Sequence, residues 1–272
     1  MAYLCGVDID GTFTDCAIVD GEGRLFPGKA PTTPEDRSKG FFDSVASAAE
    51  RAGVSVAELI GQTDRFLHGT TVATNAMVER VGAKVGLITT RGHGDVLLMM
   101  RGTGRTVGLP VEAMLNLVES DKPAPLVPRA LIREVDERVD YSGEVVVALN
   151  EDQARAAIQS LLDDGVDAIC VSFLWSFENP AHELAVADLV RELAPDVFVT
   201  AAHELIPKWG EYERTVGAVI NCFVGPVTKR YLEATSERLR REQYQRPFLI
   251  MQSTGGLAPV EECARAPLLT VG

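Results

Sequence analysis

A ten-residue stretch near the N-terminus, GVDIDGTFTD at Gly6–Asp15, leaves two folds open for this sequence. Two carboxylates, Asp8 and Asp10, stand at the end of an apolar run. A Gly-Thr turn follows them, and Asp15 adds a third carboxylate. Carboxylates this close repel one another unless a cation lies near. The pattern therefore indicates a magnesium and phosphate site, in which either an aspartate becomes phosphorylated or a loop holds the phosphates of a nucleotide.

Composition excludes several classes of protein. The chain has 272 residues, of which 46% are hydrophobic and 24% charged, as in soluble globular proteins. No apolar run is long enough to span a bilayer, and the N-terminus lacks the basic region of a signal peptide. A net charge of −13 argues against binding to nucleic acid or to an anionic membrane. We therefore expect a cytoplasmic protein with neither nucleic acid nor membrane as partner.

The cysteines fit the same compartment. Their number is odd, their spacing is wide, and no CxxC pair occurs; they are Cys5, Cys16, Cys170, Cys222 and Cys263. We interpret them as reduced thiols of the core, with a catalytic thiol as the alternative. Together with four scattered histidines, they give no zinc-ligand spacing.

The first third of the chain predicts strands, then helices. Strands are expected at 3–9, 15–20 and 24–30, with a turn at each junction. A helix is expected to begin at the N-cap Thr33, with Pro34 in its first turn, and to end at Gly53. Ser55 caps a shorter helix. Residues 65–90 then read as strand, turn, helix and strand, with Gly82 as the helix stop.

The middle of the chain predicts an alternating α/β arrangement. Residues 101–128 are rich in Gly and Pro and are expected to be irregular, and a hairpin is expected over 130–149. Asn150 caps a helix that ends near Gly165. A central strand at 166–175, a helix at 179–193 and a strand at 196–202 follow.

The last part of the chain has a different character. It predicts a long helix over 211–242, interrupted near Gly225-Pro226, and strands at 247–253 and 266–272. We expect two domains, 1–200 and 201–272. Because the chain ends on an apolar run that enters a Gly-rich turn, we also expect it to be the N-terminal part of a longer protein.

Taken alone, Asp-x-Asp-Gly-Thr at a strand end is the first motif of the haloacid-dehalogenase-like phosphatases. There the first aspartate, here Asp8, attacks phosphorus, and the second, here Asp10, protonates the leaving group. Such an enzyme also needs a later acidic pair at a strand end. The pair Asp163-Asp164 instead lies at the predicted end of a helix.

The second interpretation is the phosphate-binding hairpin of the sugar-kinase, actin and heat-shock ATPase superfamily. A strand aspartate there holds magnesium, and the turn presents backbone N–H groups and a hydroxyl to the phosphates. The segment FTDCAIVD after the turn fits the returning strand of such a hairpin. An acidic turn without any ligand is the third alternative.

Four motifs in this order favour the hairpin: GVDIDGTFTD, FLHGTTVATNAMVERVGAKVGLITTRGHGDVL, HELIPKWGEYERTVGAVINCFVGP and LIMQSTGG. From Leu4 to Gly272 the chain resembles the hydantoinase/oxoprolinase family, which includes N-methylhydantoinase A subunits, 5-oxoprolinases and subunits of acetone and acetophenone carboxylases. The resemblance implies an α/β fold of the actin-like ATPase (ribonuclease H-like) type. It would have a mixed sheet with helices on both faces and would be incomplete in this chain.

The resemblance also implies ATP and Mg²⁺ as cofactors and assigns a set of site residues. Asp8 and Asp10 would hold the metal, and Asp8, Asp15, His68 and Glu211 are the candidate catalytic residues. Candidate nucleotide contacts are Asp10, Gly11, Thr12, Thr14, Thr70, Thr71, Asn75, Ser253, Gly255 and Gly256. The family usually has Gly where Asp10 stands, so a charged side chain here either binds magnesium or repels phosphate.

Several of these residues have simpler alternatives. Thr70 or Thr71 can be plain helix caps, and His68 can be a core histidine rather than a general acid. Glu211 can pair with Arg214 on one helix face, or it can orient water or metal near the phosphates. The segment Ser253–Gly256 can be an ordinary β-turn, or its glycines can let backbone approach a ligand.

The leading hypothesis is a subunit of an ATP-dependent enzyme. ATP would phosphorylate the carbonyl oxygen of a cyclic amide such as a hydantoin, oxoproline or lactam before hydrolysis, or activate the substrates of a ketone carboxylation. A B-type partner subunit and an oligomer are expected. Because a second phosphate loop and an adenosine-binding segment should follow residue 272, this chain alone is expected to be inactive. The alternatives are the phosphatase and a non-catalytic nucleotide-binding or assembly module.

Overall fold

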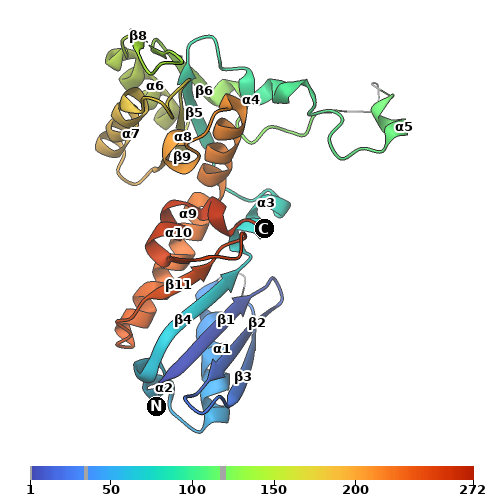
Figure 1. The fold of residues 1–272 in the computed structure, drawn as a ribbon, viewed down its shortest axis with the longest axis vertical. Helices are drawn as coiled ribbons and strands as arrows, with labels where there is room; N and C mark the ends of the chain where they lie inside the picture. The colour runs from blue at the N-terminus through green and yellow to red at the C-terminus, as the bar shows by residue number, and fades with distance from the viewer. Residues whose placement is uncertain (1, 34–35, 117–120) are drawn as a thin grey trace. The chain divides into compact units, whose positions relative to one another are not determined.

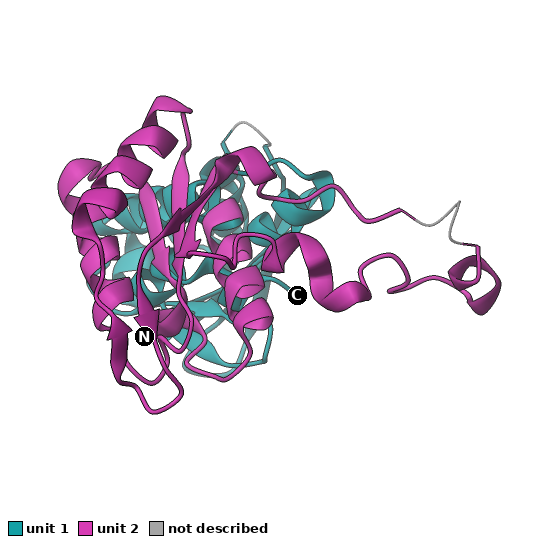
Figure 2. Cartoon of the chain, turned by 90° about the horizontal axis from the view of Figure 1, so that it is seen from above, with its two compact units in different colours: residues 1–82, 224–272 teal, residues 83–223 magenta. Residues whose placement is uncertain are grey.

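A computed structural model describes residues 2–33, 36–116 and 121–272. The chain forms two compact units (Figure 2). Unit 1 comprises residues 1–82 and 224–272, and unit 2 comprises residues 83–223. This division differs from the boundary expected near residue 200. The chain returns to unit 1 because the strand at Phe248–Met251 pairs with the strand at Thr63–Thr70. No local sequence pattern predicts this pairing.

Unit 1 is built on a six-stranded mixed sheet (Figure 1). Its strands, in spatial order, are β12 (Leu257–Pro259), β11 (Phe248–Met251), β4 (Thr63–Thr70), β1 (Tyr3–Ile9), β2 (Phe13–Val19) and β3 (Leu25–Pro31). The first three strands of the chain form the expected antiparallel meander. β4 lies parallel to β1, and β11 lies parallel to β4. Three strands therefore end at the same edge of the sheet, β1, β4 and β11.

Side chains along β1 alternate between the two faces of the sheet, and one of these faces forms the core of unit 1. Its odd-numbered residues, Tyr3 to Ile9, are buried and point to one face of the sheet. Helices α1 (Arg37–Ala52), α2 (Val56–Gln62) and the C-terminal half of α9 (Glu211–Arg241) contribute to that core. Even-numbered positions face the other way, and Leu4 is 48% exposed there. The hairpin carboxylates stand on this second, open face.

Two helix signals in unit 1 are confirmed and two are corrected. Gly53 ends α1 in the left-handed conformation, and the Ser55 hydroxyl accepts from the Glu58 amide to start α2, as predicted. The N-cap of α1 is Asp36 rather than Thr33, because the Asp36 carboxylate accepts from the Ser38 amide; Pro34 lies outside the described residues. Helix α3 (Val72–Glu79) ends on Arg80, not on Gly82.

The end of the chain also differs from expectation. Residues 267–270 form a 3-10 turn, η3 (Pro267–Thr270), instead of a strand. Pro267 opens this turn because proline suits the first helical position. The strand after the Gly255-Gly256 turn is β12, and α10 (Val260–Arg265) follows it.

Unit 2 is an α/β unit around a parallel sheet of four strands. In spatial order they are β10 (Phe198–Ala201), β9 (Ala168–Ser172), β5 (Val85–Thr90) and β6 (Ile132–Val135). Every residue of β5 and β9 is buried, so both faces are covered. The Asn150 cap of α6 (Glu151–Asp163) is confirmed, since its side chain accepts from the Gln153 amide.

Helices cover the two faces of this sheet from different parts of the chain. α6 packs on β5 through Leu161, close to Gly86, and α7 (Ala181–Leu193) lies beside α6. On the opposite face, the N-terminal part of α9 contacts β9 through a hydrogen bond between Thr215 and Ser172. The predicted interruption near Pro226 is wrong, because α9 continues through this proline as one helix.

The remaining parts of unit 2 are short. β7 (Arg138–Val139) and β8 (Val145–Val147) form the predicted hairpin. The Gly- and Pro-rich stretch contains α4 (Val96–Met99), η1 (Met100–Gly102), α5 (Val111–Met114) and, after residues 117–120, η2 (Arg129–Leu131). α8 (Ala202–Leu205) follows β10. Within the described residues, no helix combines the length and the apolar character that crossing a membrane requires.

Candidate functional site

The candidate phosphate site is the tight turn between β1 and β2. The Asp10 amide donates to the Phe13 carbonyl at 3.0 Å, which places Gly11 and Thr12 at the tip of the turn. Both tip residues are exposed. Among the described residues, none accepts a hydrogen bond from the Gly11 or Thr12 amide. Exposed backbone N–H groups without an acceptor are the donors that a phosphate-binding loop offers.

The carboxylates beside the turn stand in a cross-strand row on the open face of the sheet. Asp8 lies opposite Asp15 in the β1–β2 register, and Asp15 lies opposite Lys29 on β3. The Lys29 ammonium contacts the two Asp15 carboxylate oxygens at 2.8 and 3.0 Å. Asp15 is therefore paired with a cation within the sheet, whereas no described basic side chain forms an ion pair with Asp8.

Gly69 makes room for the Asp8 carboxylate. It neighbours Asp8 on β4, and a Cβ atom at this position would lie 2.5 Å from Asp8 Oδ1. Partial burial and the negative charges of Asp10 and Asp15 raise the pKa of Asp8, against a backbone hydrogen bond at Ile9 that lowers it. A divalent cation at this point would relieve that repulsion.

The residues beside the turn fit magnesium, which Asp8 and Asp10 would hold. In the part of the chain that the structure describes, no three His, Cys, Asp or Glu residues group as a complete metal site. Mg²⁺ prefers hard oxygen ligands, keeps several waters and is held by one or two carboxylates plus substrate phosphates. Asp8 and Asp10 at an exposed turn offer that donor set.

The turn after β4 lies against the same hairpin. The Thr71 hydroxyl donates to the Ile9 carbonyl at 3.1 Å, and the Asn75 amide donates to the Thr71 hydroxyl at 3.2 Å. Asn75 Nδ2 also lies 3.9 Å from the point where a Cβ on Gly11 would stand. Thr71 is thus tied to the strand end rather than capping α3 with its side chain. Thr70, the last residue of β4, accepts instead from the Val72 amide at 3.3 Å.

The loop between β11 and β12 reaches the same sheet edge. The Gly255 amide donates to the Gln252 carbonyl at 2.9 Å, and Gly255 adopts a φ of 88°, which only glycine takes without strain. Ser253 is fixed by bonds from its amide and hydroxyl to the Leu269 carbonyl. The carbonyl of Gly256, next to Gly255, accepts from the Gln252 amide at 2.8 Å.

Thr14 and His68 do not face the open side of the hairpin. Thr14 is buried because strand alternation turns it toward the core, where its hydroxyl lies 3.0 Å from the Thr32 hydroxyl. Thr32 in turn donates to the Asp10 carbonyl at 2.8 Å. Thr14 therefore supports the turn from inside, which corrects its assignment as a direct nucleotide contact.

His68 has the surroundings of a structural histidine. It is fully buried, its Nδ1 lies 2.9 Å from the Val7 carbonyl, and its Nε2 lies 2.7 Å from the Tyr231 hydroxyl. Because the carbonyl only accepts, Nδ1 carries the proton and Nε2 accepts from Tyr231. Burial lowers the pKa of His68 to about 4. Both nitrogens are occupied, so the geometry supports the core interpretation over a general acid.

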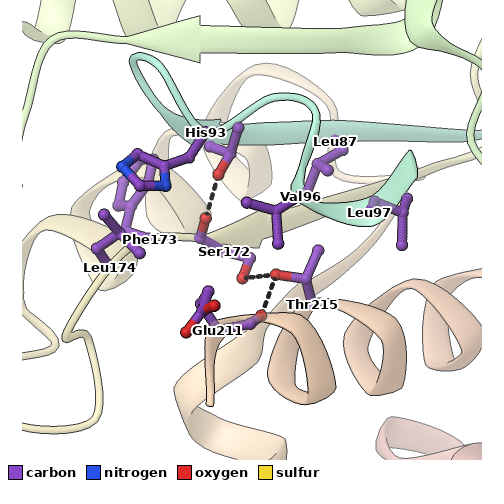
Figure 3. A pocket seen from close by; sticks show the side chains of 10 residues that line it. Leu87, His93, Val96, Leu97, Ser172, Phe173, Leu174, Glu211 and Thr215 are labelled. Carbon is purple, nitrogen blue, oxygen red and sulfur yellow. Dashed lines mark hydrogen bonds between the residues drawn. The ribbon is translucent and has the colours of Figure 1, made fainter. Parts of the chain in front are cut away.

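Glu211 belongs to unit 2, whereas the hairpin belongs to unit 1. It borders a small pocket at the ends of β5 and β9 (Figure 3). The ion pair expected with Arg214 does not form. Arg214 is buried and donates instead to the Phe173 carbonyl at 2.8 Å and the Lys208 carbonyl at 3.1 Å.

Three residues that shape the site or its surroundings were not predicted from the sequence: Gly69, Lys29 and Tyr231. Strand register is the signal that could have found the first two, because both stand level with Asp8 or Asp15 across a neighbouring strand. Tyr231 lies 163 residues after His68, and no local pattern marks that contact.

Comparison with known proteins gives a consistent result. The family described as "Hydantoinase/oxoprolinase N-terminal region" matches residues 4–194, and "Hydantoinase/oxoprolinase" matches residues 214–272. The chain is 40% identical to the acetophenone carboxylase gamma subunit of Aromatoleum aromaticum, covering 93% of this chain and 35% of that protein. It is 38% identical to the caprolactamase subunit alpha of Pseudomonas jessenii, covering 94% of this chain and 36% of that protein.

Solved structures show the same fold. Nucleotide-free acetone carboxylase matches with a TM-score of 0.89 and 30% identity over 98% of this chain and 38% of that chain. The ATP-dependent caprolactamase from Pseudomonas jessenii matches with a TM-score of 0.83 and 38% identity over 96% and 36%. The mixed sheet and its helices are consistent with the actin-like ATPase fold. The chain spans little more than a third of these relatives' length, and it belongs to the hydantoinase/oxoprolinase family.

Proposed function

We propose that the chain supplies the first phosphate-binding hairpin of an ATP-dependent enzyme subunit. The enzyme would use ATP to activate a carbonyl oxygen, either for hydrolysis of a cyclic amide or for carboxylation of a ketone. The observation that carries this proposal is the pair of amides at Gly11 and Thr12, from which no described residue accepts a hydrogen bond, beside the exposed Asp8 carboxylate. Relatives that are ATP-dependent carboxylase and caprolactamase subunits support it.

The residues of this chain would act by position and charge. The Gly11 and Thr12 amides would donate to phosphate oxygens, and the Thr12 hydroxyl would add a third donor. Asp8 and Asp10 would hold Mg²⁺, whose bound charge would offset that of the phosphate oxygens. Lys29 would offset the charge of Asp15 and so reduce the repulsion between Asp15 and the incoming phosphate.

We further propose that Asp10 shares the cation with Asp8 instead of repelling the nucleotide. The charge of Asp10 raises the pKa of Asp8, so the two carboxylates repel each other and a shared cation would relieve that repulsion. An Asp10→Gly variant should then need more magnesium for half-maximal ATP turnover. A variant that binds the nucleotide more tightly at unchanged magnesium would show that Asp10 is repulsive.

A second subunit is part of the proposal. The similar proteins are alpha, beta and gamma subunits by name, which supports a partner for this chain. We also infer a cytoplasmic location, because all five cysteines are free and buried.

The test uses the full-length enzyme with its partner subunit and γ-labelled ATP. Phosphate release should depend on a cyclic amide or ketone and on magnesium, and should fall by at least a hundredfold in Asp8→Asn. Asp43→Asn is the matched control, because Asp43 lies on α1 in an exposed pair with Lys39.

Acid quenching distinguishes the two alternatives. An aspartyl phosphate that disappears in Asp8→Asn would establish the phosphatase interpretation and refute the hairpin. Nucleotide binding without turnover of any carbonyl compound would instead indicate a non-catalytic binding module.

A further inference from the structure

An arm extends from unit 2 and adds nothing to its core. The arm comprises residues 100–116, with η1 at its start and α5 near its end, and it leads away from the body of unit 2 in both views (Figure 1, Figure 2). All residues of the arm are described, and none of them is buried. The arm therefore does not stabilise unit 2 by packing, which leaves its apolar side chains to be explained.

The arm is fixed at its base. The Arg101 guanidinium donates to the Glu213 carboxylate on α9 at 2.6 Å. Farther out, the backbone hydrogen bonds between described residues are local; in α5, for example, the Leu115 amide donates to the Val111 carbonyl at 3.3 Å. The base thus holds the arm to unit 2, whereas α5 makes no described backbone hydrogen bond to the body of the unit.

Helix α5 presents an apolar face with the spacing of a docking helix. Val111, Met114 and Leu115 stand at positions i, i+3 and i+4, so they share one side of the helix. Val111 is 67% exposed and Leu115 is 81% exposed, and Val107, just before the helix, is 74% exposed. A single exposed leucine needs no explanation, but a cluster of large apolar side chains on one short segment marks an interaction site.

Helix α5 is also too short to be stable by itself. Most of the stability of a helix in a protein comes from packing of its apolar face, and isolated helices of fewer than about 12 residues are marginal in water. α5 has four residues and buries none of them. Gly108, with a φ of 81°, and Pro110, with a φ of −66°, restrict the chain ahead of it. The helix therefore needs a covering surface that the described residues do not supply.

Charge and size distinguish the possible covers. Two copies of the chain each carry a net charge of −13 and repel each other, as an anionic membrane would repel the chain. A contact between two arms would also join only a few side chains per copy, against about 20 to 30 residues on each side of a stable interface. Neither a second copy nor a membrane is therefore the favoured cover.

The charges of the arm indicate what the cover carries. Both arginines of the arm, Arg101 and Arg105, form ion pairs within unit 2. Glu112 lies on α5 beside the apolar face, is exposed, and forms no ion pair with a described residue. The charge left open on the arm is therefore negative, like that of the whole chain. A positively charged surface would be attracted to both.

We propose that the arm inserts α5 into an apolar groove with a basic rim on a second, different protein chain. Val111, Met114 and Leu115 would fill the groove, and Glu112 would face a lysine or arginine at the rim. This is recognition of a helix by a groove, in which three side chains act as anchors. The identification of this second chain with the partner subunit rests on the proposed function.

The first test is photo-crosslinking in the full-length subunit together with its partner subunit. A benzophenone amino acid takes the place of Leu115, and mass spectrometry identifies the peptide to which it becomes linked. We expect an apolar segment of the partner subunit that also carries lysine or arginine. Linkage to a second copy, linkage to another segment of the same chain, or no linkage would overturn the proposal.

The second test measures the affinity of the two full-length subunits for each other. Leu115→Asp should weaken it at least about tenfold, because a charge enters the apolar groove, whereas Leu115→Met should keep it. The urea midpoint of the isolated subunit should not change, since Leu115 is exposed. Val146→Asp is the matched control, because Val146 lies on β8 of the same unit and is 62% exposed. Equal affinities in Leu115→Asp and Val146→Asp would refute the assignment to the arm.

The third test concerns the rim. A charge at the rim of an interface changes the association rate and its salt dependence more than it changes the affinity. Glu112→Lys should therefore slow association of the two subunits at low salt, and the difference from the wild type should vanish at high salt. Faster association of Glu112→Lys, or an unchanged rate, would overturn the basic rim.

Asp8→Asn distinguishes this inference from the proposed function. It alters the hairpin of unit 1, so it should abolish ATP turnover and leave the association of the subunits intact. If turnover depends on Asp8 but association ignores Leu115, the assignment of the arm fails alone. If association depends on Leu115 but turnover ignores Asp8, the hairpin proposal fails alone.

Discussion

Acid should destabilise unit 1 through His68. In the folded chain burial holds the pKa of His68 at about 4, against 6.5 for an exposed histidine. Because the folded value is the lower one, the unfolded chain takes up the proton first as the pH falls below 6.5. Stability is therefore lost between pH 6.5 and pH 4, and it is fully present above that window. The shift predicts a loss of about 2 to 3 kcal/mol between pH 7 and pH 4.5.

The assay is urea unfolding at pH 7 and pH 4.5, compared between the wild type and His68→Gln. The comparison removes the contribution of other titrating groups. The unfolding free energy of the variant should therefore fall less between pH 7 and pH 4.5 than that of the wild type, by about 2 to 3 kcal/mol. Circular dichroism reports both units. Tryptophan fluorescence reports unit 2, because Trp175 and Trp209 both belong to it. The difference between the wild type and His68→Gln should appear in circular dichroism and not in tryptophan fluorescence.

His93→Gln is the matched control. His93 is half-buried and lies in unit 2, so its replacement should leave the acid loss of unit 1 unchanged. If His68→Gln does not fold, NMR titration of the wild-type imidazole gives the pKa directly. A His68 ring that titrates near 6.5, or equal pH dependence in wild type and variant, would refute the buried neutral histidine.

Further predictions concern glycines, a cap and the thiols. Gly69→Ala places a methyl group against Asp8 and should weaken Mg·ATP binding by the full-length enzyme about tenfold or more, with little change in the urea midpoint. Gly28→Ala brings a Cβ within 2.1 Å of the Ser44 carbonyl oxygen, and overpacking of two backbones should cost about 3 kcal/mol in the same unfolding assay. Asn150→Ala removes the bond to the Gln153 amide and should cost about 1 kcal/mol, measured by tryptophan fluorescence. All five cysteines are buried, so a thiol reagent should label none of them in the native protein and all five in urea; rapid labelling at neutral pH would contradict this burial.

Local signals predicted local structure well. The hairpin turn follows from its Gly-Thr pair, the caps Ser55 and Asn150 from their spacing, and the strand β9 from its apolar run. Their causes lie within a few residues of one another, so the sequence displays them directly. The family resemblance added the fold class, which the turn alone left open.

Long-range contacts were not predictable in the same way. Whether His68 is a catalytic group or a core residue depends on Tyr231 and on the Val7 carbonyl, both distant in sequence. The division into units depends on the pairing of β11 with β4. The core side of Thr14 follows from the alternation of side chains along β2, which a turn motif does not display.

The insertion of unit 2 within unit 1 has a consequence for folding during synthesis. Unit 1 needs β11 beside β4, yet β11 begins at Phe248, after all of residues 83–223 have been made. The ribosome therefore releases a complete unit 2 while unit 1 still lacks two strands, β11 and β12, and the end of α9. Such non-local pairing closes late, and the unfinished sheet edge at β4 stays open to other chains meanwhile. The β1–β2 hairpin is translated before unit 2, and the sheet that supports it is completed only after unit 2.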